Sequence, residues 1–181
     1  MIYMFLADGF EEIEALATLD ILRRAQIEIK TVSIKSTNIV SGSHGISVAA
    51  DITIDDVDEN TLSGVILPGG MPGTTNLLNS DKVLQLVKLS FDKGLLTAAI
   101  CAAPMILGKM GLLEGKTATC YPGFEEHLKG AEISDDFAVV SQNIITAKGA
   151  GAAFEFAFKI IEFIKGEETV ETLKRSMQCI G

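Results

Sequence analysis

The feature that most constrains this chain is a mainly apolar run, residues 95–100, that stops abruptly at Cys101. A run without alternating polar residues is typical of a parallel strand that is buried on both faces of a sheet. Small residues and Pro104 follow the cysteine and open a helical pattern that continues to about Met110. The sequence therefore predicts a buried strand, a sharp turn and a helix, with a thiol at the turn.

A cysteine at such a turn has two possible roles. The unpaired N–H groups of a first helical turn favour a negative charge, so a thiol there tends to ionise to the nucleophilic thiolate. Ala99, Ala102 and Ala103 are small enough for the close passage that a nucleophile elbow requires. The alternative is that Cys101 is one more small residue of the core, the usual fate of a free cysteine. The local sequence leaves both roles open.

Length and composition favour a single α/β domain over residues 1–181. Strand patterns alternate with helical patterns, and no repeat or low-complexity linker interrupts them. The 15 basic and 24 acidic residues give a net charge of −9, which argues against nucleic acid or an anionic membrane surface as a partner. Three scattered cysteines fit neither a disulfide framework nor a zinc site, so we expect a reducing cytoplasm. Residues 1–7 are short and lack a basic leader, so we expect a buried strand there and not a signal peptide, and no stretch approaches the length of a membrane span.

The first helix is expected directly after this strand. Asp8 with Glu11 three residues later has the form of a capping box, and the helical pattern extends to about Ala25. One helix face carries residues spaced by three and four: Ile13, Leu16, Ala17, Asp20, Ile21 and Arg24. Glu14 lies beside this face, which makes it a candidate for partial burial at the carboxyl end of the first strand. The alternative is a solvated glutamate in the first turn.

Two glycines follow the strand expected at residues 64–67. Gly69 and Gly70 allow backbone N–H groups to point into a crevice, as in an anion-binding nest or an oxyanion hole. In an open α/β sheet, ligands bind outside the carboxyl ends of the strands. Because the strands at 1–7, 64–67 and 95–100 end along one edge of the sheet, we expect Glu14, the two glycines and Cys101 to converge.

The remaining segments complete a doubly wound sheet. We expect strands at 27–34 and 117–120, a turn at 41–45 between two short strands with 52–57 extending that antiparallel excursion, a hairpin at 139–146, and helices at 74–78, 81–92, 152–165 and 167–177. His44 is expected in an exposed loop and His127 on a short helix. Gly149 and Gly151 open a helix, but Phe154 stands where a dinucleotide fingerprint needs glycine or alanine, so we reject nucleotide binding.

Several motifs in this order resemble the DJ-one (ThiJ/PfpI) family, in the branch that contains the Parkinsonism-associated deglycase. The matching segments are residues 8–14 (DGFEEIE), 23–25 (RRA), 67–70 (LPGG), 98–104 (AAICAAP) and 148–157 (KGAGAAFEFA). The resemblance implies a flavodoxin-like sandwich of the class I glutamine amidotransferase-like type. It also implies a homodimer.

The resemblance also implies roles for individual residues. Cys101 corresponds to the reactive cysteine, Glu14 to a protonated glutamate that is hydrogen-bonded to it, and the N–H groups around Gly69, Gly70 and Ala102 to the oxyanion hole. Relatives with cysteine-centred enzymology usually carry a histidine where this chain has Tyr121. Tyrosine has an ordinary pKa of about 10 and is not a base at neutral pH, so we assign Tyr121 to substrate binding. Ala102 likewise stands where the protease-like branch has a histidine.

The activity implied by the resemblance is that of a glyoxalase III or deglycase. Such an enzyme acts on methylglyoxal and similar small reactive carbonyls, or on their early adducts, without a metal or an organic cofactor. Two alternatives stay open. One is an oxidative-stress sensor or chaperone-like protein in which Cys101 is oxidised, and the other, suggested by the family name alone, is a role in thiamine-precursor metabolism.

Overall fold

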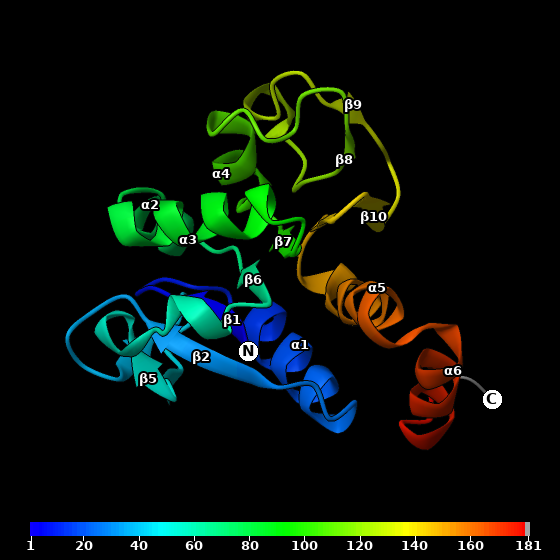
Figure 1. Ribbon diagram of the computed structural model, residues 1–181, viewed down its shortest axis with the longest axis horizontal. Coiled ribbons are helices and arrows are strands. Elements are labelled where there is room, and N and C mark those ends of the chain that lie inside the picture. The colour runs from blue at the N-terminus through cyan, green and yellow to red at the C-terminus, as the bar shows by residue number, and fades with distance from the viewer. Residues whose placement is uncertain (180–181) are drawn as a thin grey trace.

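The computed structural model describes residues 1–179, and its centre is a seven-stranded sheet with the strand order β10-β11-β7-β6-β1-β2-β5 (Figure 1). Neighbouring strands are parallel except β10 and β11, which form the predicted antiparallel hairpin. The strands are β1 (Ile2–Leu6), β2 (Ile29–Ser33), β5 (Ile52–Thr53), β6 (Gly64–Leu67), β7 (Leu96–Ile100), β10 (Ala138–Ser141) and β11 (Ile144–Ala147).

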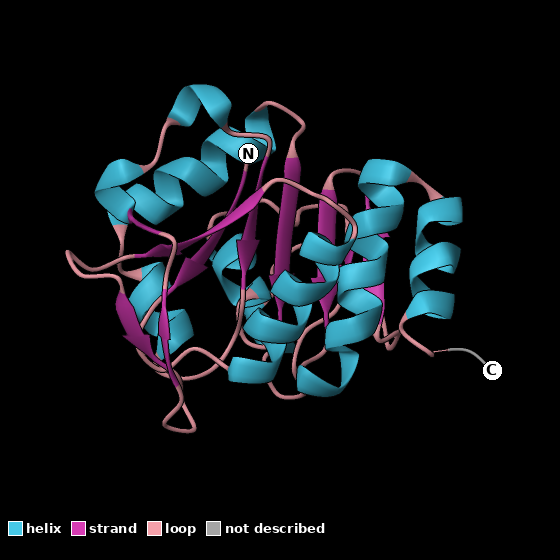
Figure 2. Cartoon of the chain, turned by 90° about the horizontal axis from the view of Figure 1, so that it is seen from below, coloured by secondary structure: helices cyan, strands magenta, loops and turns pink. Residues whose placement is uncertain are grey.

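Helices cover both faces of this sheet, so the strands lie between two helical layers (Figure 2). One layer consists of α1 (Glu12–Arg24), α5 (Ala153–Lys165) and α6 (Glu167–Ser176), and the other of α2 (Gly73–Leu78), α3 (Asp81–Asp92) and α4 (Pro104–Lys109). Successive strand residues point to opposite faces: in β1, Met4 packs into the first layer and Phe5 into the second, and both are fully buried. The predicted flavodoxin-like α/β sandwich is confirmed. Within residues 1–179, no helix has the length and apolar character needed to cross a membrane.

Among residues 1–179, two small pairs of strands and four short 3₁₀ helices lie outside the main sheet and its two helical layers. β3 (Ile39–Ser41) and β4 (Ser47–Ala49) form the predicted antiparallel pair, and β8 (Thr117–Ala118) pairs parallel with β9 (Glu132–Ile133). The 3₁₀ helices are η1 (Ile54–Asp56), η2 (Glu59–Thr61), η3 (Glu125–His127) and η4 (Ala150–Ala152).

The segment 52–57 was expected to extend the antiparallel excursion, and this prediction was wrong. β5 joins the main sheet, parallel to β2, and the chain then turns into η1. Asp51 explains the difference because its carboxylate accepts hydrogen bonds from the N–H and the hydroxyl of Thr31, each at 2.8 Å. These bonds hold the start of β5 against β2.

The start of α1 also differs from the prediction. Glu11 is the N-cap, and its Oε2 accepts a hydrogen bond from the Glu14 N–H at 2.7 Å. Asp8 instead accepts bonds from Lys35 Nζ and from the Ser41 N–H, so it ties the end of β1 to the segment after β2 and to β3. The capping box fails because Gly9, with a φ of 87°, turns the chain between Asp8 and the helix.

The buried face of α1 is rotated from the predicted one. Ile13 is 54% exposed, although it belongs to the predicted face. The helix packs on both the sheet and α5, and its first turn buries two carboxylates. The buried residues are Glu12, Glu14, Ala15, Thr18, Ile21 and Leu22.

Candidate functional site

Cys101 lies at the turn directly after β7, as predicted. Its φ of 66° is in the left-handed region, which non-glycine residues rarely occupy and which recurs at active sites. The Cys101 N–H donates to the Ala147 carbonyl, and the Cys101 carbonyl accepts from the Tyr121 N–H, both at 2.8 Å. Hydrogen bonds on both sides therefore hold the residue in this conformation. The turn separates the thiol from α4, which begins at Pro104.

Gly69 brings the thiol and Glu14 together. A Cβ atom at this position would lie 2.6 Å from the Cys101 Cβ and 2.7 Å from Glu14 Oε2, so only glycine fits between them. The Gly69 N–H donates a hydrogen bond to Glu14 Oε2 at 2.8 Å. The predicted convergence of Glu14, the glycine turn and Cys101 is present in the structure.

Glu14 is buried, with 1% exposure, which rules out the alternative of a solvated glutamate. Burial raises the pKa of its carboxyl to about 7, and the negative charge of Glu11 adds to this, against the hydrogen bonds from Cys101 and Gly69. Within residues 1–179, its Oε1 atom has no hydrogen-bond partner of ordinary geometry. Glu14 therefore carries a proton over much of the neutral range, and one of its buried oxygens keeps an unused hydrogen-bonding position.

The pKa of Cys101 moves opposite to the prediction. Burial raises it to about 12 and the neighbouring Glu14 adds to the rise, while the N–H groups of Gly70 and Ala102 lower it. The helix was expected to produce a thiolate, but α4 starts beyond the turn and burial outweighs the N–H groups. Because a charged Glu14 repels a thiolate, the sulfur ionises most easily when Glu14 keeps its proton.

The three oxyanion candidates have different surroundings. The N–H groups of Gly70 and Ala102 act on the Cys101 sulfur, whereas the N–H of Gly69 is bound to Glu14. Gly70 has a φ of 88°, and a Cβ there would lie 2.4 Å from the Glu11 nitrogen, so this position requires glycine. Gly70 and Ala102 thus remain available for a developing oxyanion, and Gly69 serves to hold Glu14.

Tyr121 borders the same site. Its Cδ2 lies 3.2 Å from the position that a Cβ would take at Gly149, and Glu14 Oε1 lies 3.8 Å from that same position. The ring is 50% exposed and meets Phe124 edge to face. Tyr121 and Glu14 thus both lie against the backbone at Gly149, and half of the Tyr121 side chain remains exposed. His127, on η3, contacts Phe124, and its Nε2 lies 3.8 Å from Glu126.

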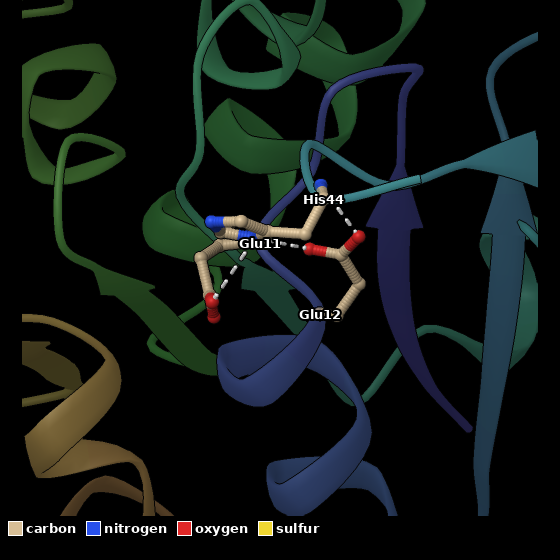
Figure 3. A group of neighbouring side chains, drawn as sticks. All are labelled: Glu11, Glu12 and His44. Atoms are coloured by element: carbon tan, nitrogen blue, oxygen red, sulfur yellow. Dashed lines mark hydrogen bonds and ion pairs between the residues drawn. The ribbon is translucent and has the colours of Figure 1, made fainter. Parts of the chain in front are cut away.

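A second cluster lies beside this site and was not predicted: it consists of Glu11, Glu12 and His44 (Figure 3). Glu12 Oε1 accepts hydrogen bonds from the N–H groups of His44 and Ile46, and Oε2 accepts from the Ser43 hydroxyl and from His44 Nδ1. Burial favours the protonated form of Glu12, but the hydrogen bonds prevail and lower its pKa to about 2. The only signal in the sequence was the acidic pair at positions 11 and 12.

The ligand atoms of this cluster lie within 4.8 Å of one another, as a metal site would require. However, both oxygens of Glu12 already accept hydrogen bonds from the turn at residues 43–46, and one oxygen of Glu11 caps α1. The cluster is therefore accounted for as the anchor of that turn. The ring of His44 is exposed, as expected, and its pKa is raised by the bond to Glu12.

A flavodoxin-like sandwich with a cysteine at the elbow after a central strand, facing a buried glutamate, defines a class of α/β proteins with a cysteine–glutamate pair at the carboxyl ends of the strands. The model of the DJ-1/PfpI family matches residues 1–163. The chain belongs to the DJ-1/PfpI family.

Curated relatives agree with this assignment. Protein DJ-1 homolog B of Arabidopsis thaliana is 37% identical over 164 residues, or 90% of this chain. The chain spans only 37% of that protein and 43% of its Arabidopsis paralogue, homolog A. Glutathione-independent glyoxalase DJR-1.2 of Caenorhabditis elegans is 34% identical, with 94% of this chain and 91% of that protein covered. A deglycase of Pyrococcus abyssi is 28% identical, with 88% and 96% covered.

Solved structures show the same fold. Oxidized DJ-1 of Toxoplasma gondii superposes with a TM-score of 0.94 at 35% identity, covering 98% of this chain and 97% of that one.

Proposed function

We propose that the chain is a cysteine-dependent glyoxalase or deglycase that acts on small 2-oxoaldehydes such as methylglyoxal, or on their early adducts, without a cofactor. The observation that carries this proposal is the buried Glu14, whose raised pKa and unpaired oxygen lie beside Cys101. A carboxyl with a pKa near 7 can both donate and accept a proton at neutral pH. Two relatives named as a glyoxalase and a deglycase support the same chemistry.

The proposed reaction requires only the residues of this site and water. The Cys101 sulfur adds to the aldehyde carbon, the carbonyl electron pair moves to oxygen, and the N–H groups of Gly70 and Ala102 stabilise that oxygen. Glu14 then removes the proton from this carbon and returns a proton to the neighbouring carbon, while the proton given up by the thiol ends on the oxygen of that neighbouring carbon, which becomes the hydroxyl. The first carbon is oxidised, the second is reduced, and a 2-hydroxyacyl thioester results. Water cleaves the thioester, which releases the 2-hydroxy acid and restores the thiol.

Lactate formation from methylglyoxal, in the absence of added thiol, tests this proposal. Cys101→Ser is expected to lower the rate by at least about 100-fold, because a hydroxyl is a far weaker nucleophile in this setting. Cys179→Ser is the matched control, since that thiol is exposed near the end of the described chain. Equal rates for the wild type and Cys101→Ser would exclude the mechanism.

A second candidate is an oxidative-stress sensor or chaperone-like protein. Tyr121 favours it, because a histidine is usual at this position in relatives with cysteine-centred enzymology and a phenol does not replace it as a base. A protonated Glu14 could donate a hydrogen bond to an oxidised sulfur as well as to an oxyanion. Intact-mass measurement after mild peroxide separates the two functions. Addition of two oxygen atoms at Cys101, in a protein that forms no lactate, supports the sensor.

We also propose that the chain forms a homodimer and acts in the cytoplasm, where thiols stay reduced. Large apolar side chains in and near the turn at residues 43–46 support the dimer: Ile13, Ile39 and Ile46 are each more than half exposed. Burying them against a second copy would remove apolar surface from water. Sedimentation of the wild type and of Ile13→Lys tests this, since the variant is expected to shift toward the monomer.

A further inference from the structure

The charges that act on the proposed nucleophile are negative. Glu14 raises the pKa of Cys101, and Glu11 in turn raises that of Glu14. Basic side chains from the same edge of the sheet are engaged elsewhere: Lys35 pairs with Asp8, and Lys148 pairs with Asp135. A ligand that approaches the thiol therefore meets acidic groups.

Glu11 is an unusual choice for its structural task. Serine, threonine, aspartate and asparagine are the common N-cap residues, and one short acceptor is enough. Glu11 caps α1 with Oε2 alone, at 2.7 Å from the Glu14 nitrogen. Its Oε1 is not used in the cap, and it lies 3.9 Å from His44 Nδ1. The longer side chain thus keeps a second negatively charged oxygen, which the cap does not require.

This carboxylate is fixed close to the turn that borders the thiol. The Glu11 N–H donates to the Gly69 carbonyl at 3.0 Å, and the Glu11 nitrogen lies 2.4 Å from where a Cβ at Gly70 would be. The side chain is only 13% exposed, so water screens its charge incompletely. Its negative charge raises the pKa of Glu14, which in turn lies beside Cys101.

His44 offsets the charge of this cluster only in part. Its Nδ1 is bound to Glu12 at 2.9 Å and lies 3.9 Å from Glu11 Oε1, and its ring is 71% exposed (Figure 3). One histidine faces two carboxylates, so a protonated His44 balances at most one of their two negative charges. A neutral His44 balances neither.

We propose that Glu11 makes the Cys101 site selective by charge. The site admits uncharged or cationic carbonyl compounds, such as 2-oxoaldehydes and their adducts on amines, and disfavours carbonyl compounds that carry a carboxylate, such as 2-oxo acids. Glu11 is the residue that determines this specificity. The part of this inference that concerns substrates rests on the proposed function. The charge selectivity of reactions at the Cys101 thiol does not, because it can be measured without catalytic turnover.

Alkylation of Cys101 by two reagents of nearly equal size tests the inference. Iodoacetamide is neutral and iodoacetate is an anion; in both reactions the sulfur–carbon bond forms as iodide leaves and the thiol proton passes to solvent. The ratio of the two rates is measured at Cys101 by peptide mass spectrometry, with the exposed Cys179 of the same molecule as the reference. We expect the neutral reagent to be preferred at Cys101 about tenfold more than at Cys179, since an incompletely screened charge at this range is worth about a factor of ten.

The Glu11→Gln variant tests whether Glu11 causes this preference for the neutral reagent, because the amide keeps an oxygen for the helix cap and loses only the charge. The preference at Cys101 is expected to fall about threefold to tenfold. Glu28→Gln is the matched control: it removes the same charge from an exposed position just before β2, at the opposite edge of the sheet, and leaves the ratio unchanged. Added salt should narrow the preference in the unmodified protein, which tests the inference without any variant.

Each outcome supports or contradicts the inference. A ratio at Cys101 equal to that at Cys179, or a ratio unaffected by both Glu11→Gln and salt, overturns it. If the ratio behaves as expected and no lactate forms from methylglyoxal, the proposed function fails while the charge selectivity stands. If lactate does form, kcat/KM for methylglyoxal is expected to exceed that for 4,5-dioxopentanoate, a 2-oxoaldehyde that carries a carboxylate, and Glu11→Gln to reduce the difference. Equal values for the two substrates in the wild type would contradict the inference.

Discussion

Glu12 and Glu14 lie two residues apart in the first turn of α1, and each is at most 5% exposed, yet their carboxyls behave in opposite ways. Glu12 accepts four hydrogen bonds from the turn at residues 43–46, and its pKa falls to about 2. Glu14 accepts one backbone bond, from Gly69, and its pKa rises to about 7. Exposure alone does not set the protonation state of a carboxyl. The number of donors that reach the charged form decides it.

Two glutamates of the same helical turn therefore have different roles, one in stability and one in proton transfer. Glu12 is a permanent anion that organises a neighbouring loop, so its contribution is to the folded state. Glu14 is left short of donors beside a thiol, so its proton is available for transfer. Removing each carboxyl should therefore produce different losses.

The largest effect is expected for Glu14→Gln. The amide keeps the shape and an acceptor for the Gly69 N–H but cannot transfer a proton, so lactate formation from methylglyoxal should fall by about 10² to 10⁴-fold. Glu12→Gln makes the same chemical change two residues away and should retain most of the activity. Comparable losses in both variants would mean that the two glutamates do not differ in role.

The pH dependence of stability should divide in the same way. Glu14 has a folded-state pKa of about 7 against an ordinary 4.5, so its contribution is fully present below pH 4.5 and is lost as pH rises to about 7, a change of about 3 kcal/mol. Urea unfolding across this range should show the loss, and Glu14→Gln should abolish it. Glu12 has the opposite sign: its contribution is present above pH 4.5 and is lost as pH falls toward 2. If the free energy of unfolding depends on pH in the same way in the wild type and in Glu14→Gln, the raised pKa of Glu14 is contradicted.

Glu12→Gln should lower the free energy of unfolding by about 1–3 kcal/mol. An amide offers one acceptor oxygen where the carboxylate offered two, so donors from His44, Ser43 or Ile46 lose their partner. The urea midpoint at neutral pH measures the effect. Glu132→Gln, on the exposed strand β9, serves as the control and should leave the midpoint unchanged.

The smallest effect concerns His44. Its pKa should lie above the ordinary 6.5 because protonation strengthens its bond to Glu12, and any stabilisation that it provides should be lost as pH rises through that raised value. Titration by NMR of the two histidines in this chain measures it directly. The Glu12→Gln variant should return the pKa of His44 to its ordinary range. An ordinary pKa of His44 in the wild type would contradict the ion pair between His44 and Glu12.

Much of the central sheet was predictable because its strands follow from the local pattern of apolar residues. Continuous apolar runs identified β1, β6 and β7, and the rule that parallel strands end at one edge brought Glu14, Gly69 and Cys101 together before any coordinates. The rotation of α1 was not predictable in this way. Its buried face depends on α5 and on the turns that cover its first residues, and these are distant in sequence.

The protonation states of the residues in the site also depend on partners that are distant in sequence. The position of Cys101 before a helix favoured a thiolate, but the sequence did not show that burial of the thiol would outweigh the N–H groups that favour its ionised form. Glu12 could not be recognised as an anchor because its donors come from residues more than 30 positions later. Motifs thus identified which groups meet, and three-dimensional packing determined which of them hold protons.

The left-handed backbone at Cys101 has a consequence for how this protein can change. Glycine adopts a φ of 66° freely, whereas a side chain there costs about 1 kcal/mol or more. A chain selected only to stay folded would carry glycine at this position. Libraries screened for heat tolerance alone should therefore discard the thiol, and retention of Cys101 requires selection on its chemistry.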